Sequence, residues 1–487
     1  MKINGYALDK EQLKPIIENK PYSLIIAGAG SGKTLTLIGK IKYLLDQGYA
    51  TNEEILCLSF TNETTQNLKA NIQKNCHTHC PVFTFHKLAL TILKEKNFTI
   101  ASPTLLEETI TEFFASACLG NKTLQNIIYH KFTLFKKPWS KLLKTKSLLN
   151  YQKTILTFIN LFQNKDLSLQ DFKNFFNTQK YIPDLCIIYA ILLLYETEKQ
   201  STNSIDFDDM IKLATQYLKE HKPSLPYKYI IIDEFQDTSL VRFNLIQEIL
   251  HLTNASLCVV GDDYQSIYRF SGCDNNLFLN FQNYFPNTTI YKLEKTYRNS
   301  EELITIAGKF IQKNPYQIKK NLKSDKHLKN PLKLIYYTNP KKDLINLIHT
   351  LDPTKEILIL SRTSYDLKNY TTYTQKKNNY ITIPTLENYS IRYLTIHKSK
   401  GLESDIVILL NVSNDLYGIP CQRKDEHILQ LIQNQETYPY DEERRLFYVA
   451  LTRTKSRIYL LIPKKNPSIF LKEIKHLTTQ KRRIKFP

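Results

Sequence analysis

Short apolar runs rich in branched side chains alternate along the chain with stretches in which apolar residues recur every three or four positions. Strands that alternate with helices predict parallel sheets covered by helices. The alternation occurs near the start of the chain and again in its second half, so we expect two α/β units in tandem. Nine runs are typical of buried strands: residues 24–26, 55–59, 82–85, 230–232, 257–260, 357–360, 393–396, 406–410 and 458–462.

The stretch between about residues 90 and 205 breaks this alternation. Its leucine, isoleucine and phenylalanine residues recur at helical spacing, which predicts a helical insertion inside the first α/β unit. Residues 185–195 form the longest apolar run, about half the length that a membrane-spanning helix needs. We therefore interpret it as one buried helix. The N-terminal segment has no apolar core of a secretory signal, and we expect a cytoplasmic protein with no membrane partner.

The charge balance narrows the class of partner. Among 487 residues, 66 lysines and arginines face 46 aspartates and glutamates, a formal net charge of +20. Such an excess points to a polyanion. Because the membrane interpretation fails, nucleic acid becomes the leading candidate.

A glycine-rich segment follows the first predicted strand and leads into an amphipathic helical pattern. The chain has only 12 glycines, so this cluster is a local feature. Its backbone N–H groups can wrap phosphates, the lysine can reach the β and γ oxygens of ATP, and the threonine hydroxyl can hold Mg²⁺. The sequence therefore predicts an ATP site of the P-loop type, formed by Ala27, Gly28, Ala29, Gly30, Ser31, Gly32, Lys33 and Thr34.

A second acidic strand end is needed to hold the metal. The apolar strand at residues 230–232 ends in two carboxylates, Asp233 and Glu234. Asp233 would complete the Mg²⁺ shell, and Glu234 is placed to orient and deprotonate the attacking water. The separation of 200 residues from Lys33 is long for a plain P-loop core, and it again calls for a helical insertion.

With these two motifs in place, the rest of the chain resembles the UvrD/Rep class of superfamily 1A DNA helicases, and within it the helicase IV branch. The family's motifs occur in order over residues 8–462: residues 8–12, 58–62, 84–86, 233–237, 261–270, 297–299, 395–403 and 442–453. The resemblance implies two RecA-like P-loop NTPase domains in tandem. Domain 1A would comprise residues 1–90 and 205–290, the helical insertion 1B residues 91–204, and domain 2A residues 291–487.

The resemblance implies further nucleotide contacts. Gln12 would hydrogen-bond adenine and Tyr297 would stack on it, while Glu403 would reach the ribose or the γ-phosphate region. Gln265 would sense the γ-phosphate beside the DNA-contacting loop. Two arginines from the second α/β unit would act as arginine fingers across a cleft, so that hydrolysis requires closure: Arg298 and Arg453.

A DNA track is implied in the same way. Single strands are held by aromatic faces and basic grooves. Three aromatic residues stand at the matching loop positions as candidates for base stacking: Phe60, Tyr268 and Phe270. Four polar residues would contact phosphates or sugars: Thr61, Asn62, His86 and His397.

The chain differs from UvrD and Rep in the length of one segment. Only 32 residues lie between Arg362 and Thr395, too few for the large 2B domain of those proteins.

Within the helical insertion, lysines interleave with aromatic residues. This pattern fits a DNA-contacting face and a solvated face equally well. The residues concerned are Lys131, Lys136, Lys137, Trp139, Lys141, Lys144 and Lys146.

The function that these residues and the resemblance imply is an ATP- and Mg²⁺-dependent helicase and translocase. It would act on single-stranded and tailed duplex DNA as a monomer or weakly associating protein, and the resemblance implies movement from 3′ to 5′. The residues alone leave RNA open as a substrate. One rival is an ssDNA-stimulated translocase that displaces proteins without unwinding. A second, a non-enzymatic nucleotide-gated binding module, is disfavoured by the intact catalytic set.

Overall fold

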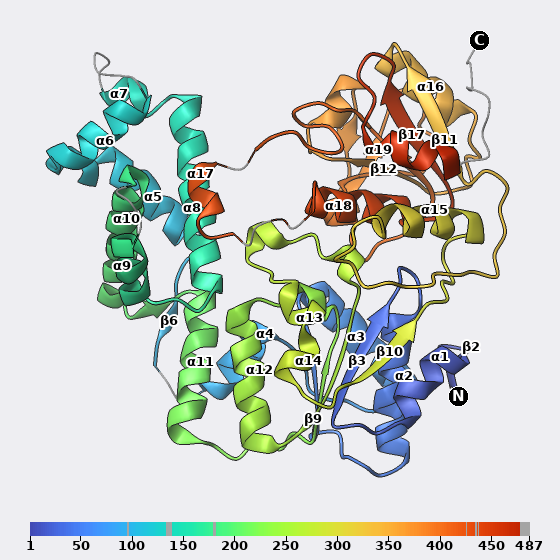
Figure 1. The fold of residues 1–487 in the computed structure, drawn as a ribbon, viewed down its shortest axis with the longest axis horizontal. Coiled ribbons are helices and arrows are strands. Elements are labelled where there is room, and N and C mark those ends of the chain that lie inside the picture. The colour runs from blue at the N-terminus through green and yellow to red at the C-terminus, as the bar shows by residue number, and fades with distance from the viewer. Residues whose placement is uncertain are drawn as a thin grey trace.

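The computed structural model describes residues 1–94, 97–132, 139–178, 182–424, 426–433, 436 and 438–477. This part of the chain forms two α/β units and a block of helices (Figure 1). The N-terminal unit is built on a six-stranded sheet, and the C-terminal unit is built on a seven-stranded sheet. We call the block of helices, residues 105–201, the helical region. The two parallel sheets confirm the predicted fold class.

The sheet of the N-terminal unit is parallel throughout. Its strand order is β10 (Thr289–Leu293), β3 (Tyr22–Ala27), β9 (Ser256–Gly261), β8 (Tyr229–Ile232), β4 (Ile55–Ser59) and β5 (Val82–Thr84). Alternate side chains enter two cores: Leu24 and Ile26 pack on one side of β3, and Ile25 and Ala27 on the other. Burial on both faces explains why these strands read as continuous apolar runs.

Helices cover both faces of this sheet. One face packs against α1 (Lys10–Ile17), α2 (Lys33–Asp46) and α3 (Asn62–Cys76). The other packs against α4 (Phe85–Ile92), α11 (Phe207–His221), α12 (Leu240–Thr253), α13 (Asn276–Leu279) and α14 (Phe281–Tyr284). The short strands β1 (Lys2–Ile3) and β2 (Tyr6–Ala7) pair at the N-terminus.

The sheet of the C-terminal unit has the order β11 (Leu332–Tyr337), β17 (Thr454–Pro463), β16 (Ser404–Leu409), β12 (Ile357–Ser361), β15 (Ile391–Thr395), β14 (Tyr380–Thr382) and β13 (Thr374–Gln375). Only β14 and β13 run antiparallel to their neighbours. One face packs against α15 (Glu301–Ile311), α18 (Asp441–Leu451) and α19 (Phe470–Ile474), and the other against α16 (Pro340–His349). All of residues 363–394 are described, and they contain two short 3₁₀ turns, β13, β14 and the first four residues of β15, not a separate domain.

The helical region has its own aromatic and aliphatic core. It contains α5 (Leu105–Ala115), α6 (Lys122–Phe132), α7 (Trp139–Leu142), α8 (Lys146–Asn164), α9 (Leu169–Thr178) and α10 (Pro183–Ser201). The chain enters and leaves it through β6 (Thr99–Ile100) and β7 (Ser204–Ile205), which pair in parallel. This pair corrects the expectation that residues 90–205 hold no strand.

One short helix of the C-terminal unit leaves that unit and joins the helical region. In Figure 1 α17 (His427–Gln430), in red, lies against α8, in teal. Ile428, Leu429 and Ile432 are buried in the core of the helical region. We call residues 426–433 the α17 segment. It ties two parts of the fold that are far apart in sequence.

All nine predicted strands form, and the strands that were not predicted lie mainly at sheet edges. β10 and β11 are edge strands with polar positions among the apolar ones, so the apolar-run signal is weak there. Because β10 pairs with β3, the N-terminal sheet extends past the boundary predicted at residue 290. The predicted buried helix is α10, but Leu193 and Leu194 on it are 41% and 40% exposed. Among the described helices, none combines the length and apolarity needed to cross a membrane.

Candidate nucleotide cleft and adjoining pocket

The glycine-rich loop lies between the carboxyl end of β3 and the start of α2. Gly30 and Gly32 have φ angles of +72° and +79°, in the left-handed region that glycine adopts without strain. A Cβ atom at Gly30 would lie 2.6 Å from the Cβ atom of Arg298, so the loop also needs glycine for close packing. Gly32 precedes Lys33 at the helix start and provides no side-chain cap. The N–H groups of the first helical turn are thus left for an anion.

Two carboxylates face the loop from the end of β8. Lys33 Nζ lies 2.7 Å from Glu234 Oε1, and the Thr34 hydroxyl lies 3.5 Å from Asp233 Oδ2. Burial, reinforced by Glu234, raises the pKa of Asp233 to about 6. Although burial works in the opposite direction, Lys33 and then Lys400 lower the pKa of Glu234 to about 2. The carboxyl group of Asp233 therefore has a higher pKa than that of Glu234. The oxygen atoms of Thr34 and Asp233 are ligands of the kind that a hard cation such as Mg²⁺ prefers.

Two arginines reach the cleft from the C-terminal side. Arg298 Nε pairs with Glu403 Oε2 at 2.7 Å, and its Nη1 donates to the Thr452 carbonyl at 3.3 Å. Arg453 is only 1% exposed, and its Nη2 donates to Gln265 Oε1 at 3.0 Å. Burial, together with the charge of Arg298, lowers the pKa of Arg453 to about 9. Two arginines thus stand in the cleft, and Arg453 reaches across it to the N-terminal unit.

Gln12 and Tyr297 both bond to backbone carbonyls of the loop. Gln12 is buried, donates from Nε2 to the Ser31 carbonyl at 3.0 Å, and accepts from the Asp9 N–H at 3.1 Å. Tyr297 is 40% exposed; its N–H donates to the Gly30 carbonyl at 2.9 Å and its hydroxyl bonds to Asp9. The structure therefore brings both predicted adenine contacts next to the phosphate loop.

Two lysines join the units in ways that the sequence reasoning did not identify. Lys400 of the C-terminal unit pairs with Asp237 Oδ2 at 2.6 Å and donates to the Gln265 carbonyl at 2.7 Å. Lys320 pairs with the buried Asp262 at 2.5 Å. Lys400 belongs to the motif at residues 395–403 and Asp237 to the motif at residues 233–237, so the sequence already showed opposite charges in these two motifs. Lys320 had no such signal.

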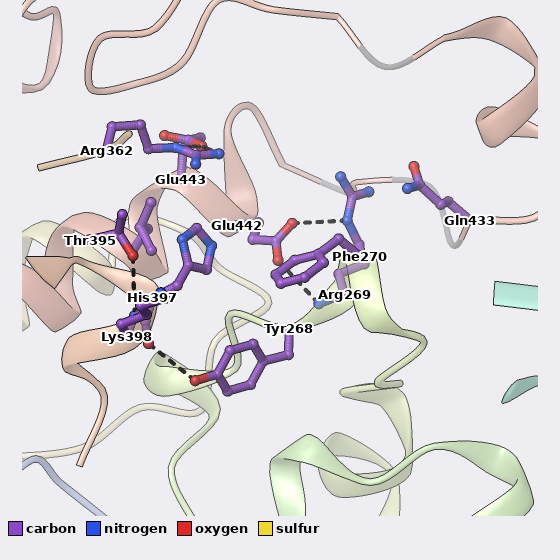
Figure 2. Close-up of a pocket in the computed structure, with 11 residues that line it drawn as sticks. Tyr268, Arg269, Phe270, Arg362, Thr395, His397, Lys398, Gln433, Glu442 and Glu443 are labelled. Carbon is purple, nitrogen blue, oxygen red and sulfur yellow. Dashed lines mark hydrogen bonds and ion pairs between the residues drawn. The ribbon is translucent and has the colours of Figure 1, made fainter. Parts of the chain in front are cut away.

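A cavity of about 550 Å³ adjoins the cleft (Figure 2). Tyr268 donates its hydroxyl to the His397 carbonyl at 3.1 Å, while Phe270 is 50% exposed with its ring 5.5 Å from the imidazole of His397. Arg269 is held by Glu442 through its N–H at 3.1 Å and its Nε at 3.2 Å. The cavity is lined by Tyr268, Arg269, Phe270, Arg362, Thr395, His397, Lys398, Gln433, Glu442, Glu443 and Leu446.

The other predicted DNA contacts lie elsewhere on the N-terminal unit, at the ends of β4 and β5. Phe60 is half-buried, with its ring 5.2 Å from that of Phe85. Thr61 caps α3, and the exposed Asn62 is the first residue of that helix. Burial lowers the pKa of His86 to about 4. These residues do not line the cavity shown in Figure 2.

The lysine-rich stretch of the helical region is partly engaged in the fold. Lys131 pairs with Asp184 at 3.0 Å and lies 4.5 Å from the ring centre of Tyr151. Trp139 donates its indole N–H to the Phe114 carbonyl at 2.8 Å and is half-buried. Three lysines are solvent-exposed: Lys141, Lys144 and Lys146. Two lie outside the described residues: Lys136 and Lys137.

Comparisons with known proteins agree with this geometry. Residues 8–286 match the family model of the UvrD/REP helicase N-terminal domain, and residues 377–465 match that of the UvrD-like helicase C-terminal domain. The chain is 28% identical over 502 residues to DNA helicase IV of Escherichia coli (strain K12), which covers 98% of this chain and 71% of that protein.

Two further relatives share less of their own length. The chain is 27% identical over 468 residues to ATP-dependent DNA helicase Rep of Buchnera aphidicola subsp. Schizaphis graminum, covering 89% of this chain and 66% of Rep. It is 28% identical over 331 residues to ATP-dependent DNA helicase PcrA of Staphylococcus epidermidis, covering 65% of this chain and 41% of PcrA. Because the first family model alone spans more than half of the chain, this protein is an enzyme of the UvrD/REP helicase family.

Proposed function

We propose that this chain is an ATP-dependent DNA helicase that translocates on single-stranded DNA. The observation that carries the proposal is the position of residues 261–270. At one point of this segment Gln265 accepts a hydrogen bond from Arg453 in the nucleotide cleft, and five residues later Phe270 forms part of the adjoining pocket. A change in the cleft therefore has a short covalent route to the pocket. We propose the division into domains 1A (1–90 and 205–290), 1B (91–204) and 2A (291–487), with the end of β10 extending the sheet of 1A past residue 290.

The nucleotide chemistry follows from the charges in the cleft. Lys33 and the N–H groups of the first turn of α2 would bind the triphosphate, and Thr34 with Asp233 would hold Mg²⁺. The metal would neutralise charge on the β- and γ-phosphates when bound. An incoming triphosphate competes for Lys33, and this releases Glu234 from its 2.7 Å ion pair. Glu234 is then an ionised acceptor for the proton of an attacking water.

The two arginines would complete the site when the units close. Arg298 and Arg453 both come from the C-terminal side, and they would stabilise the charge that develops on the transferred phosphoryl group. Gln12 and Tyr297 would hold the adenine and Glu403 the ribose or γ-phosphate region. Release of the cleaved phosphate after hydrolysis removes the charge that attracts the arginines, so the cleft can reopen.

The pocket of Tyr268 and Phe270 would hold the bases of a single strand. The exposed ring of Phe270 is available for stacking, worth about 1–3 kcal/mol per base. Phe60, Thr61, Asn62, His86 and His397 would extend the track along the N-terminal unit and the cleft edge. We propose 3′ to 5′ movement, tailed duplex as the substrate for unwinding, and action as a monomer or weakly associating protein.

A second candidate function is translocation that displaces bound proteins without unwinding. The observation that favours it is the content of residues 363–394, in which the described chain forms β13, β14 and most of β15 and no further domain. Such an enzyme would hydrolyse ATP on single-stranded DNA but would leave a tailed duplex paired.

One experiment distinguishes these functions. Strand displacement is measured on duplexes with a 3′ tail or a 5′ tail, and ATP hydrolysis is measured in parallel with and without single-stranded DNA. A helicase displaces the strand from the 3′-tailed duplex, and Lys33→Ala does not. ATPase without displacement on either duplex supports the translocase, and ATPase that ignores single-stranded DNA contradicts both proposals.

A further inference from the structure

A buried lysine that the sequence did not predict bonds both to the start of the phosphate loop and to two aspartates at the end of β9. Lys320 lies in the connecting segment, residues 312–331, between α15 and β11, and its side chain is 1% exposed. Its Nζ lies 2.5 Å from Asp262 Oδ1 and 2.7 Å from Asp263 Oδ1, and both carboxylates are fully buried. It also donates to the Ala27 carbonyl at 3.2 Å, where β3 ends and the phosphate loop begins.

The connecting segment is fixed to the N-terminal unit around this lysine. Tyr264 donates its hydroxyl to the Ile318 carbonyl at 2.6 Å, and the Ile318 N–H donates to Asp263 Oδ2 at 2.9 Å. The ring of Tyr264 lies beneath the ammonium, 3.8 Å from its centre. Leu322 packs over Gly28 of the phosphate loop, so closely that a Cβ atom there would lie 2.6 Å from Leu322 Cδ2. The segment thus lies against the loop itself.

A continuous chain of hydrogen bonds leads from Lys320 to the arginine in the cleft. Asp262 accepts from Lys320 through Oδ1 and from Gln265 Nε2 through Oδ2, the latter at 2.5 Å. Gln265 Oε1 accepts from Arg453 Nη2 at 3.0 Å. A carboxylate only accepts and a guanidinium only donates, so one orientation of the Gln265 amide satisfies both neighbours. Asp262 therefore determines which end of Gln265 faces Arg453.

Lys320 fixes the position of Asp262. Two carboxylates side by side in a water-excluded site need a cation, and Lys320 Nζ is the ammonium that the described residues place on both. Without it, Asp262 Oδ1 would lose its ammonium partner whether or not Asp263 is charged, and the acceptor that orients Gln265 would move.

We propose that Lys320 is a positioning residue for ATP hydrolysis, acting through Asp262 and Gln265 on Arg453. The proposal rests on the proposed function, since it assigns Lys320 to the same cleft. Lys320 also holds the carbonyl at the start of the phosphate loop, so one side chain aligns the loop with the arginine across the cleft. Misplacement of a catalytic group by about 1 Å can lower a rate by roughly 10²-fold.

The test uses the full chain with Lys320→Met, Lys320→Arg, and Lys319→Met as the matched control, because Lys319 is exposed one position earlier. Wild-type ATPase on single-stranded DNA is measured first; its absence contradicts the proposed function and leaves the second readout, hydrogen exchange, to decide on Lys320. For Lys320→Met we expect kcat to fall at least about tenfold with KM for ATP within about threefold, and partial recovery in Lys320→Arg. Amide exchange should rise in peptides that contain Asp262 to Ser266.

A purely structural role predicts a different result. Lys320→Met combined with Asp263→Asn keeps the net charge of the buried trio unchanged, so it should recover the melting temperature. We expect kcat to stay low in this double variant and amide exchange near Gln265 to stay high. Recovery of kcat together with the melting temperature would overturn the proposal, as would equal kcat for Lys320→Met and Lys319→Met.

Discussion

The C-terminal unit meets the rest of the molecule in two chemically different ways. At the nucleotide cleft buried charges join the units beside apolar packing: Lys400 pairs with Asp237 at 2.6 Å, Arg453 donates to Gln265 at 3.0 Å, and Tyr264 and Ile267 pack into the core of the C-terminal unit. At the α17 segment the contact is apolar, with Ile428, Leu429 and Ile432 in the core of the helical region. In Figure 1 α17 lies against α8, apart from α15 and α18 of the C-terminal unit.

The two contacts respond differently to a ligand. A buried ion pair gains about as much as it loses by desolvation, so a new charge such as a triphosphate can rearrange it at little net cost. A buried aliphatic side chain contributes about 1.5–3 kcal/mol that no charge competes for. We therefore expect the cleft to open and close while the α17 segment stays docked. The helical region would then follow the C-terminal unit or pivot at α8.

The largest effect is expected at the polar contact. Glu234→Gln removes the acceptor for the water proton but keeps the shape of the side chain. The rate of ATP hydrolysis should fall by ~10²–10⁴-fold, while ATP binding, measured by fluorescence of a labelled nucleotide, should persist. Loss of nucleotide binding in this variant would mean that Glu234 is structural.

The apolar contact should carry stability instead of rate. Ile428→Ala removes a side chain that is 3% exposed, and we expect a loss of about 2–5 kcal/mol in the stability of the docked arrangement. Limited proteolysis near the α17 segment and the midpoint of urea unfolding measure it. Leu416→Ala is the control, since Leu416 is 54% exposed. Unchanged cleavage near the α17 segment would contradict the prediction that this apolar contact holds the segment on the helical region.

A smaller effect is expected at the pocket between the two contacts. Phe270→Ala should weaken binding of single-stranded DNA by about 1–3 kcal/mol, as measured by fluorescence anisotropy, with little change in melting temperature. Phe60→Ala is the informative contrast, because Phe60 packs against Phe85 at 5.2 Å. For it we expect a lower melting temperature together with any change in DNA binding. If Phe60→Ala weakened DNA binding without lowering the melting temperature and Phe270→Ala lowered the melting temperature, Phe60 would be the stacking residue and Phe270 the packing residue.

Local signals explain what the sequence predicted well. The phosphate loop and the acids after β8 depend on a few neighbouring residues at a strand end, so their place in the fold followed from position alone. The inner strands were predicted because burial on both faces makes them continuously apolar. Edge strand β10 was missed because water reaches part of it, and its polar residues mask the pattern.

The parts that were missed depend on contacts between distant positions. Lys320 and Asp262 are 58 residues apart and belong to no shared spacing pattern. Ile428 and Leu429 look like ordinary loop residues, and only the fold brings them to the core of the helical region. Phe60 and Phe270 looked alike as candidates, yet neighbouring side chains leave one half-buried and the other 50% exposed.

The smallest expected effect concerns pH, and it tests whether the two histidines proposed to contact DNA carry charge. Burial lowers the pKa of His397 to about 4, with Arg362 and Lys400 acting in the same direction, and burial and Arg242 do the same for His86. Both imidazoles are therefore neutral at pH 7, and they would contact DNA through an N–H group without contributing charge. Replacing them should leave the salt dependence of DNA binding unchanged.

The same pKa shifts make stability depend on pH with a defined sign. An unfolded histidine takes up a proton near its ordinary pKa of about 6.5, whereas the folded forms of His86 and His397 do so only near 4. The unfolded state thus binds more protons between these values, and stability falls as the pH drops from about 6.5 to 4. The double variant His86→Gln with His397→Gln should flatten this fall in melting temperature, whereas His251→Gln, at an exposed position, should not. Parallel pH profiles for wild type and the double variant would mean that folding does not lower the pKa of these rings.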